Sequence, residues 1–228
     1  MHTMSTDRLA RTGEEPGTAT SLAGRAYEAI RQRLILLGIR PGDPINDVAL
    51  AAELGVGRTP VREALKRLET DHLVVSYPRR GTFATVVDVT ELGAISDIRK
   101  LLEPHAARRA AENASPAMRA ELRARAAEIR RLDLADDDRD GFLTEDMSVH
   151  RLIYAAAGNP HLPDVLIRYD NLATRIWCLV IDRLPDLAEH IRGHADLLEA
   201  IADGEADLAA RLTSEHVSHF EDAIRGVL

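Results

Sequence analysis

Four side chains in the second half of this 228-residue chain have the chemistry of a metal site. Asp146 and His150 are four positions apart, so a helix would present both side chains from the same face. His194 and His216 lie near the middle of two later stretches with helical periodicity. One carboxylate and three imidazoles from three helices would suit a divalent ion of the Zn²⁺, Ni²⁺ or Mn²⁺ class. We therefore predict a metal site inside a helical domain.

Other histidines compete for the same role. His190 lies one helical turn before His194, and His219 lies nearly one turn after His216. Helical geometry alone does not choose among these four histidines. A lone histidine on a helix is also more often a hydrogen-bonded or partly exposed residue than a ligand. The spacing of Asp146 and His150 alone is therefore weak evidence for a metal.

A second metal interpretation concerns the acidic stretch 136–141. Its aspartates and Gly141 match the first half of a calcium-binding loop. Such a loop needs a bidentate glutamate at its twelfth position, and Met147 stands there instead. We interpret this stretch as a solvated acidic linker.

Composition indicates a core-forming protein that stays in the cytoplasm. Hydrophobic residues make up 45% of the chain and aromatic residues only 4%, which favours helices over sheets. The single cysteine, Cys178, excludes an internal disulfide, and we expect it and Trp177 to be core residues. No apolar run approaches the ~18 residues that would span a bilayer. Residues 1–21 lack the apolar core of a signal peptide and are expected to form a flexible tail.

The net charge of −8 is unevenly distributed along the chain. Residues 22–86 carry ten basic and seven acidic side chains, whereas residues 87–228 carry seventeen basic and twenty-seven acidic ones. This contrast favours two domains with different partners, and it supports nucleic-acid binding by the first domain weakly.

The first domain has the pattern of a helix-turn-helix. Ser21 can cap a helix over residues 22–37, and Asn46 or Asp47 can cap a second, short helix. The glycines at 55 and 57 predict a tight turn before a third helix over residues 59–70. The outer face of this third helix is basic and carries Arg58, Thr59, Arg62, Lys66 and Arg67. A helix with this face fits the major groove of DNA, where arginine can pair with guanine.

A wing follows this helix. Two β-prone runs at residues 73–75 and 82–86 flank a loop whose tip carries Arg79, Arg80 and Gly81. Such a tip can press against phosphates or a minor groove. Each piece alone fits a solvated helix or an ordinary hairpin equally well, but their order predicts a DNA-binding domain over residues 22–86.

Residues 87–228 are predicted to be helical almost throughout. Turn signals at 158–160, 184–185 and 203–204 separate the stretches, and Thr90 and Ser115 are predicted caps. Six helices with short links imply an antiparallel bundle, whose interior can hold ligands and metals. The predicted fold is therefore mainly α: a winged helix-turn-helix of three helices and a two-stranded wing, followed by a six-helix bundle.

The chain resembles a known family from residue 22 to about residue 226. Pro41-Gly42, the run 55–68 and Pro78-Arg79-Arg80-Gly81 resemble the winged helix of the GntR family of bacterial transcription regulators. The second domain resembles the FCD effector domain of the FadR-like branch of that family. The matching residues there are 99–103, Asp146 with His150, 158–160, His194 with 197–201, and Ala209 with His216.

This resemblance implies roles for individual residues. Arg58, Thr59, Arg62 and Gly81 would contact operator DNA. Asp146, His150, His194 and His216 would ligate a divalent ion, and Arg99 would pair with the carboxylate of an effector. The chain departs from the family pattern at two positions, with Gly57 in place of a hydroxyl residue and Val48 in place of an arginine. The operator sequence of a relative therefore cannot be assumed for this protein.

We therefore expect a ligand-responsive repressor that binds double-stranded operator DNA as a homodimer and is released by a small carboxylate metabolite. One alternative is a metal-dependent hydrolase, but no further glutamate or histidine at motif spacing supplies a general base. That alternative also leaves the winged helix unexplained, so we predict that the protein is not an enzyme. A metal-ion sensor is the other alternative, which is less favoured because carboxylate and imidazole ligands select poorly among metals.

Overall fold

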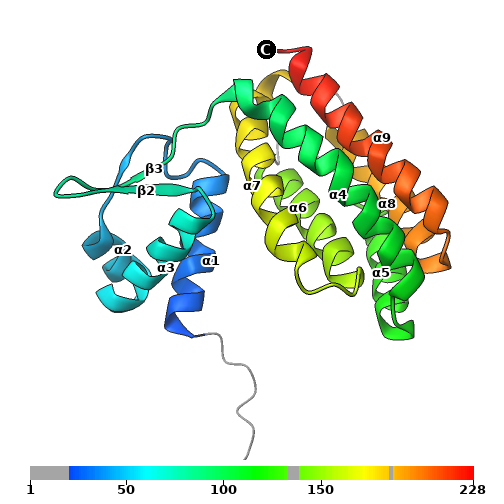
Figure 1. The fold of residues 1–228 in the computed structure, drawn as a ribbon, viewed down its shortest axis with the longest axis horizontal. Coiled ribbons are helices and arrows are strands. Elements are labelled where there is room, and N and C mark those ends of the chain that lie inside the picture. Colours follow the sequence, from blue (N-terminus) through cyan, green and yellow to red (C-terminus); the bar gives the residue numbers. More distant parts are fainter. Residues whose placement is uncertain (1–20, 133–138, 185–186) are drawn as a thin grey trace, which may run out of the picture.

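The computed structural model describes residues 21–132, 139–184 and 187–228, which form two parts joined by a short segment (Figure 1). The N-terminal part contains α1 (Leu22–Ile35), α2 (Asp47–Glu53), α3 (Arg58–Thr70) and three short strands. The C-terminal part runs from α4 (Leu92–Asn113) to α9 (Ala206–Arg225). The predicted fold, a winged helix-turn-helix followed by a helical bundle, is confirmed. The predicted tail up to residue 20 and residues 136–138 of the predicted acidic linker lie outside the described residues. The linker prediction is wrong for residues 139–141, which begin the helix Arg139–Ala156.

Most of the predicted helix caps are present. The Ser21 hydroxyl accepts the Gly24 N–H at 3.0 Å, and the Asn46 side chain accepts the N–H groups of Val48 and Ala49, both at 3.0 Å. Ser115 begins α5 (Pro116–Ile129) in the same way. These bonds satisfy N–H groups that the first turn of a helix leaves unpaired.

The predicted cap at Thr90 is wrong. The carboxylate of Asp88 accepts the Thr90 N–H at 2.9 Å and starts a 3₁₀ turn over Val89–Glu91. Helix α4 follows that turn.

The sheet has one strand more than predicted. Strands β1 (Pro44–Ile45), β2 (Val74–Tyr77) and β3 (Gly81–Ala84) pair antiparallel in the order β1-β3-β2. The β2–β3 hairpin is the predicted wing, and Arg79 and Gly81 at its tip have positive φ angles of 63° and 95°. Strand β1 is only two residues long, too short to produce the alternation that identifies a strand from sequence.

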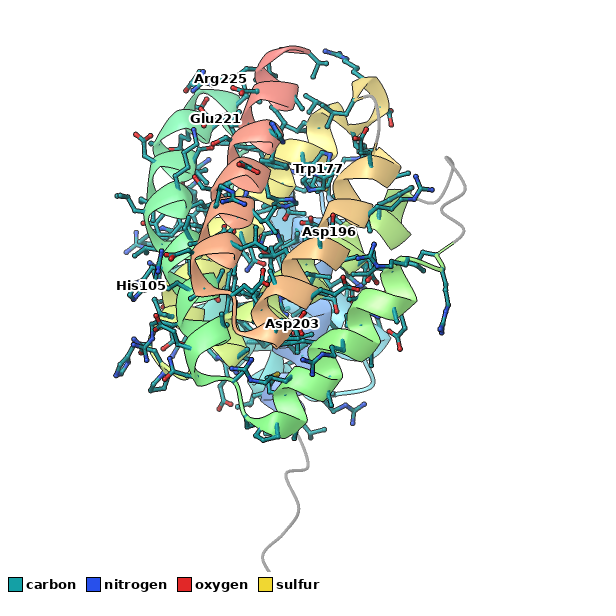
Figure 2. The ribbon with its side chains drawn as sticks, turned by 90° about the vertical axis from the view of Figure 1, so that its right-hand side faces the viewer. His105, Trp177, Asp196, Asp203, Glu221 and Arg225 are labelled. Atoms are coloured by element: carbon teal, nitrogen blue, oxygen red, sulfur yellow. The ribbon has the colours of Figure 1, made fainter. Side chains whose placement is uncertain are left out.

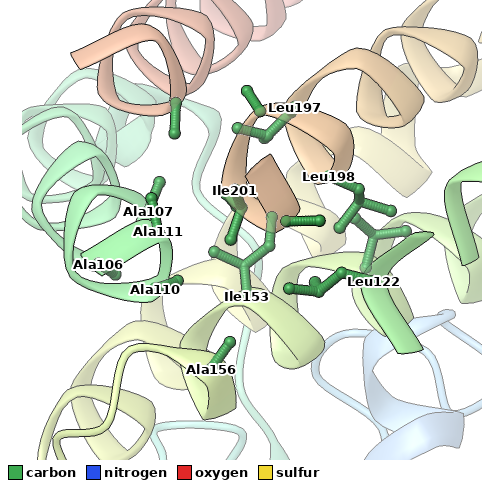
Figure 3. Close-up of a cluster of buried hydrophobic side chains, with 14 of the residues drawn as sticks. Ala106, Ala107, Ala110, Ala111, Leu122, Ile153, Ala156, Leu197, Leu198 and Ile201 are labelled. Carbon is green, nitrogen blue, oxygen red and sulfur yellow. The ribbon is translucent and has the colours of Figure 1, made fainter. Parts of the chain in front are cut away.

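A large hydrophobic core fills the C-terminal part, where α6 (Arg139–Ala156), α7 (Leu162–Val180) and α8 (Leu187–Asp203) complete the bundle. Helix α4 contributes a stripe of buried alanines, which lies near larger side chains from α5, α6 and α8 (Figure 3). Small side chains on this stripe let α4 approach its neighbours closely. The stripe and the larger side chains shown are Ala106, Ala107, Ala110, Ala111, Leu122, Ile153, Leu197, Leu198 and Ile201. Among the described residues, no helix combines the length and the apolar composition needed to span a lipid bilayer.

Helix α7 forms much of the contact between the two parts, because it packs against α1 (Figure 1). Arg175 of α7 is buried, and its guanidinium donates to the hydroxyl of Thr85 at 2.6 Å and to the Thr85 carbonyl at 2.7 Å. Thr85 directly follows β3, and its own N–H donates to the carbonyl of Leu73 beside the wing. Met147 of α6 also packs into the hydrophobic cluster of the N-terminal part. The wing is therefore anchored to the helical bundle through Thr85.

We predict that Thr85→Val lowers the free energy of unfolding by about 1–3 kcal/mol, because a buried guanidinium N–H loses its hydroxyl acceptor. The measurement is denaturant unfolding of the full chain. The double variant Thr85→Val/Arg175→Met should lose less unfolding free energy than the sum of the two single variants, because both substitutions remove the same contact.

Thr70→Val is a matched control for this prediction, because its exposed hydroxyl bonds, among the described residues, only to the Lys66 carbonyl. It should change the unfolding free energy by less than about 0.5 kcal/mol. Strictly additive losses from the Thr85 and Arg175 changes would show that the contact contributes nothing to stability.

Candidate functional site

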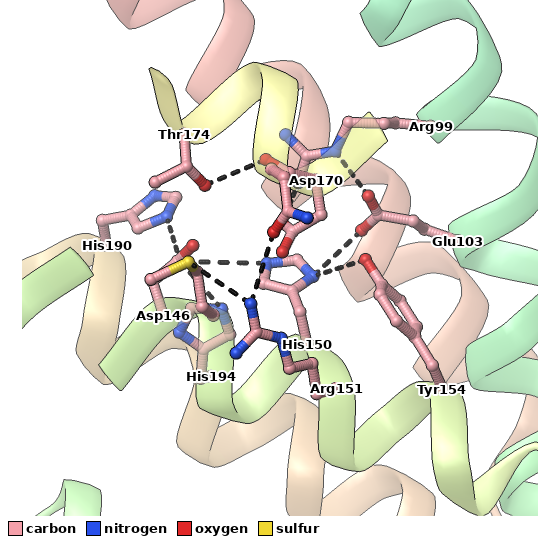
Figure 4. Close-up of polar contacts among 12 residues, drawn as sticks. Arg99, Glu103, Asp146, His150, Arg151, Tyr154, Asp170, Thr174, His190 and His194 are labelled. Carbon is pink, nitrogen blue, oxygen red and sulfur yellow. Dashed lines mark hydrogen bonds and ion pairs between the residues drawn. The ribbon is translucent and has the colours of Figure 1, made fainter. Parts of the chain in front are cut away.

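The structure brings the four predicted metal ligands together inside the bundle. Asp146 and His150 come from α6, His194 from α8 and His216 from α9, and one ligand atom from each lies within 4.8 Å of the others. Nε2 of His194 is 3.5 Å from Oδ1 of Asp146, and Nε2 of His150 is 3.8 Å from the same oxygen (Figure 4). This arrangement could hold one metal ion.

Unpaired nitrogen atoms support this interpretation. Nε2 of His150 and both ring nitrogens of His194 are buried without a hydrogen-bond partner among the described residues. A buried polar atom without a partner costs free energy, so native structures rarely contain several in one place. A divalent ion would give Nε2 of His150 and one ring nitrogen of His194 a partner, and the residues present therefore fit such an ion.

The protonation states also suit a metal. Burial lowers the pKa of His194 to about 3, although the nearby Asp146 carboxylate raises it. Burial, followed by the nearby His190 and His194, holds the pKa of His216 well below its ordinary value. Burial alone would raise the pKa of Asp146, but His150 and His190 together lower it. At neutral pH the cluster thus contains two neutral imidazoles and a carboxylate, the forms that ligate metals.

The carboxylate of Glu103 on α4 lies beside the ring of His150. Its Oε2 is 3.2 Å from Nδ1 of His150, which also lies 3.2 Å from the Tyr154 hydroxyl (Figure 4). If Nδ1 donates its proton to Glu103, Nε2 is left facing the cluster, as in many carboxylate–histidine–metal arrangements. Burial alone would lower the pKa of His150, but Glu103 and Asp146 outweigh this effect and raise it to about 9.

Arg99, the predicted effector-binding residue, is buried beside this cluster. Its Nε donates to Oε1 of Glu103 at 2.5 Å, and its Nη2 lies 3.8 Å from Oδ1 of Asp170 on α7. Its guanidinium carbon is 5.1 Å from the centroid of the Phe220 ring. The charge of Arg99 is thus matched by two carboxylates, and its role toward an effector stays a prediction.

Three residues of the site were not assigned from the sequence. Glu103 stands in the matching run 99–103 but was given no role of its own, and nothing marked Asp170 as part of the site. His190 was an open alternative to His194, and its Nε2 lies 3.1 Å from Oδ1 of Asp146. The ring centroid of His190 is 4.2 Å from that of His216 and 5.0 Å from that of Trp177.

A cavity of about 490 Å³ adjoins the cluster between α8 and α9. His190 and His216 form part of its lining, so it meets the cluster directly. Figure 2 looks onto these two helices. Trp177, another lining residue, is seen between them, and the lining residue Asp196 lies on α8. The cavity is a route by which a small molecule could reach a metal at the cluster.

The predicted DNA-contacting residues are all exposed. Arg58, Thr59, Arg62 and Lys66 lie on α3, and Arg79, Arg80 and Gly81 lie at the wing tip. Asp47 of α2 accepts hydrogen bonds from Nε of Arg62 at 2.7 Å and from Nη2 of Arg58 at 3.3 Å. Gly57, the N-cap of α3, has no side chain to occupy the first N–H groups of the helix. The start of α3 can therefore receive a DNA phosphate on its backbone amides.

We predict that His194→Ala reduces affinity for Zn²⁺ by more than the roughly 10- to 100-fold that an outer-shell residue costs, because a ligand is lost. Competition against a chromophoric chelator measures this affinity. His219→Ala is the matched control, since His219 is exposed and contributes no atom to the cluster. Equal affinities for the two variants would rule His194 out as a ligand.

Metal affinity should also depend on pH. At pH 7 the metal-free His150 carries a proton, because its pKa is about 9. A metal at Nε2 displaces this proton, so affinity should rise by up to about tenfold per pH unit between pH 7 and 9 and then level off. Calorimetry in two buffers of different ionisation enthalpy counts the released proton.

Glu103→Gln provides the matched variant for this measurement. Removing the carboxylate lowers the pKa of His150, so the pH dependence should begin at lower pH and flatten between 7 and 9. An affinity independent of pH in both proteins would contradict the assignment of His150.

Comparison with known proteins supports the DNA-binding and effector parts separately. The family described as "Bacterial regulatory proteins, gntR family" matches residues 22–84, and the FCD domain matches residues 94–219. The HTH-type transcriptional repressor RspR of Escherichia coli (strain K12) is 23% identical over 201 residues, 88% of each chain. A probable D-xylose utilization operon transcriptional repressor of Paenarthrobacter nicotinovorans is 26% identical over 205 residues, 89% of this chain and 88% of that protein.

Solved structures share the fold. E. coli McbR/YncC superimposes with a TM-score of 0.77 at 23% identity, covering 90% of this chain and 98% of that one. A putative GntR regulator from Rhodococcus sp. RHA1 gives 0.66 at 22% identity, over the same shares of the two chains. These matches remove the hydrolase alternative, because the family and the relatives are transcriptional regulators. The chain therefore belongs to the gntR family of bacterial regulatory proteins, carries an FCD domain, and is a transcriptional regulator rather than an enzyme.

Proposed function

We propose that this regulator binds operator DNA as a homodimer in the cytoplasm, and that a small carboxylate bound beside a divalent metal changes its affinity for the operator. The observation that carries this proposal is the cluster of the buried Asp146, His150 and His194 with the half-buried His216, next to a cavity and in a bundle that packs against the DNA-binding part. Two relatives named as repressors support repression as the sign of regulation.

DNA recognition would use α3 and the wing. The exposed Arg58, Thr59 and Arg62 lie in the first turns of α3, the end of a recognition helix that contacts base edges in the major groove. Lys66 and the wing residues Arg79, Arg80 and Gly81 would contact the phosphate backbone. One such domain covers a half-site, so a two-fold symmetric operator requires two copies of the chain.

Effector binding would use the cluster and the adjoining cavity. A divalent ion held by the four ligands would supply a fixed positive charge that accepts a carboxylate oxygen as a further ligand. Glu103 would hold the His150 ring in place, and His190 would hold the Asp146 carboxylate through the 3.1 Å contact.

Coupling between the two parts would run through α7. This helix carries Asp170, which lies beside Arg99, and Arg175, which binds Thr85 at the base of the wing. An effector that favours one position of α7 would favour one arrangement of the DNA-binding parts. Such couplings typically change affinity by about 5- to 150-fold.

The test is operator binding under defined metal and ligand conditions. An operator is first selected from a random DNA library, and its Kd is measured by fluorescence anisotropy with metal-loaded and with chelated protein. A carboxylate that binds the metal-loaded protein should change the Kd by about 5- to 150-fold and should have no effect on chelated protein. If no carboxylate that binds changes the Kd, the proposed coupling is wrong. A Kd that changes on chelation alone would instead identify a metal-ion sensor.

Single substitutions should separate base contacts from phosphate contacts. We predict that Arg62→Ala weakens binding to the selected operator by about 1–3 kcal/mol and relaxes its sequence preference. Arg79→Ala should weaken binding to all sequences. The slope of log affinity against log salt concentration should fall by about the amount that one phosphate contact contributes. Arg192→Ala, on the exposed face of α8, is the control and should change neither property. Unchanged operator affinity for Arg62→Ala would exclude it from recognition.

A further inference from the structure

The wall of the cavity between α8 and α9 is mainly apolar. Seven of its lining residues have hydrophobic side chains, from α7, α8, α9 and the segment that follows α7: Trp177, Leu184, Leu187, Leu197, Leu212, Phe220 and Ala223. Hydrophobic lining with a few placed polar groups is typical of sites for small organic ligands, and about 490 Å³ is a usual volume for them. The body of the ligand therefore meets aliphatic and aromatic carbon.

The charged residues of the lining are acidic. Glu189, Asp196 and Glu215 are exposed, and no lysine or arginine occurs among the described residues that line the cavity. Asp196 and Glu215 each have an arginine partner, Arg130 and Arg211, but neither arginine belongs to the lining. A second carboxylate on a ligand would thus be desolvated without a cation to compensate it.

The nearest buried cation is also occupied. Arg99 is engaged by Glu103 and Asp170, and its guanidinium packs against Phe220, whose ring lines the cavity. The positive charge that the cavity offers is therefore the metal, at the end where His190 and His216 lie. No lysine or arginine of the described lining offers a second anionic group a partner.

We infer that the effector is a monocarboxylate with an apolar body, and that dicarboxylates and polyhydroxylated sugar acids are excluded. This inference rests on the proposed function and narrows its ligand class. The carboxylate points to the metal end, and the apolar body lies against Leu187, Leu212 and Phe220. Hydroxyl groups in the same position would lose water without gaining hydrogen bonds from the leucines.

Three six-carbon acids test this inference, because they differ in one feature each. Hexanoate has one carboxylate and an apolar chain, adipate adds a second carboxylate, and gluconate replaces the apolar chain with hydroxyl groups. Calorimetric titration of the Zn²⁺-loaded full chain should give hexanoate at least about tenfold higher affinity than either of the others, the gain expected from burying two methylene groups.

Two pairs of variants connect this selectivity to the cavity. Leu212→Gln should weaken hexanoate binding by about fourfold or more, the loss of one methylene contact, whereas Leu208→Gln, a half-buried position of α9 outside the lining, should not. Glu215→Lys adds a cation to the lining and should raise adipate affinity by about two- to fivefold, the range of one exposed ion pair. Asp222→Lys, on α9 but outside the lining, is its control.

The outcomes distinguish this inference from the proposed function. If adipate or gluconate binds as tightly as hexanoate and shifts operator affinity, the ligand class is wrong and the proposed function stands. If none of the three acids binds the metal-loaded protein, the inference is wrong, and the proposed function is decided by the operator titration with other carboxylates. If Leu212→Gln leaves the selectivity for hexanoate unchanged, hexanoate does not bind in this cavity and the inference is wrong.

Discussion

The bundle depends on neutralising charge in an interior from which water is excluded. Asp146, His150, Glu103, Arg99 and Asp170 follow one another in space, acid and base alternating, with contacts between 2.5 and 3.8 Å (Figure 4). Each ionised group is stabilised by its neighbours, and removing one would leave another charge buried without compensation. Because the five side chains come from α4, α6 and α7, this row of charges fixes how those helices are placed around His194 of α8.

Asp170 lies at the far end of that row, where the neighbouring charges only partly offset the effect of burial on its carboxyl group. Burial raises the pKa of its carboxyl group to about 6, although His150 and Arg99 both lower it. Five residues later on the same helix, Arg175 binds Thr85 at the base of the wing. Five residues of α-helix correspond to a rise of about 7.5 Å, so the row of charges and the wing anchor share one short, rigid segment of α7. A change at the cluster that moves α7 must therefore also move the attachment of the wing.

Local features of the fold were predictable from the sequence, and long-range ones were not. Ser21, Asn46 and Ser115 cap helices as expected, because a cap involves only the next three residues. Strand β1 escaped prediction, because its partner β3 lies almost forty residues away and neither of its two residues signals the pairing. Thr90 was misassigned because Asp88, two positions earlier, is the better acceptor.

The same distinction holds for the candidate site. The spacing of Asp146 and His150 indicated a shared helix face, while the choice of His194 and His216 came from the family resemblance. The structure explains why His190 was a credible rival, since it reaches the same carboxylate oxygen as His194. Asp170 could not be assigned from spacing, because its partner at the site lies on another helix. Glu103 is four residues after Arg99 on the same helix, but its contact with His150 of α6 could not be read from spacing.

The contact of Asp47 with Arg58 and Arg62 has a consequence for how the regulator searches a genome. Both guanidinium groups already have an anionic partner on α2, and in the proposed DNA-binding role this partner would compete with DNA phosphates for them. In the proposed recognition role, a phosphate of random DNA would give Arg62 little more than the Asp47 contact that it replaces, whereas a guanine with two acceptors would give it a paired contact. The Asp47 carboxylate would then weaken binding to non-specific DNA more than binding to the operator, so that specificity would increase while affinity decreases.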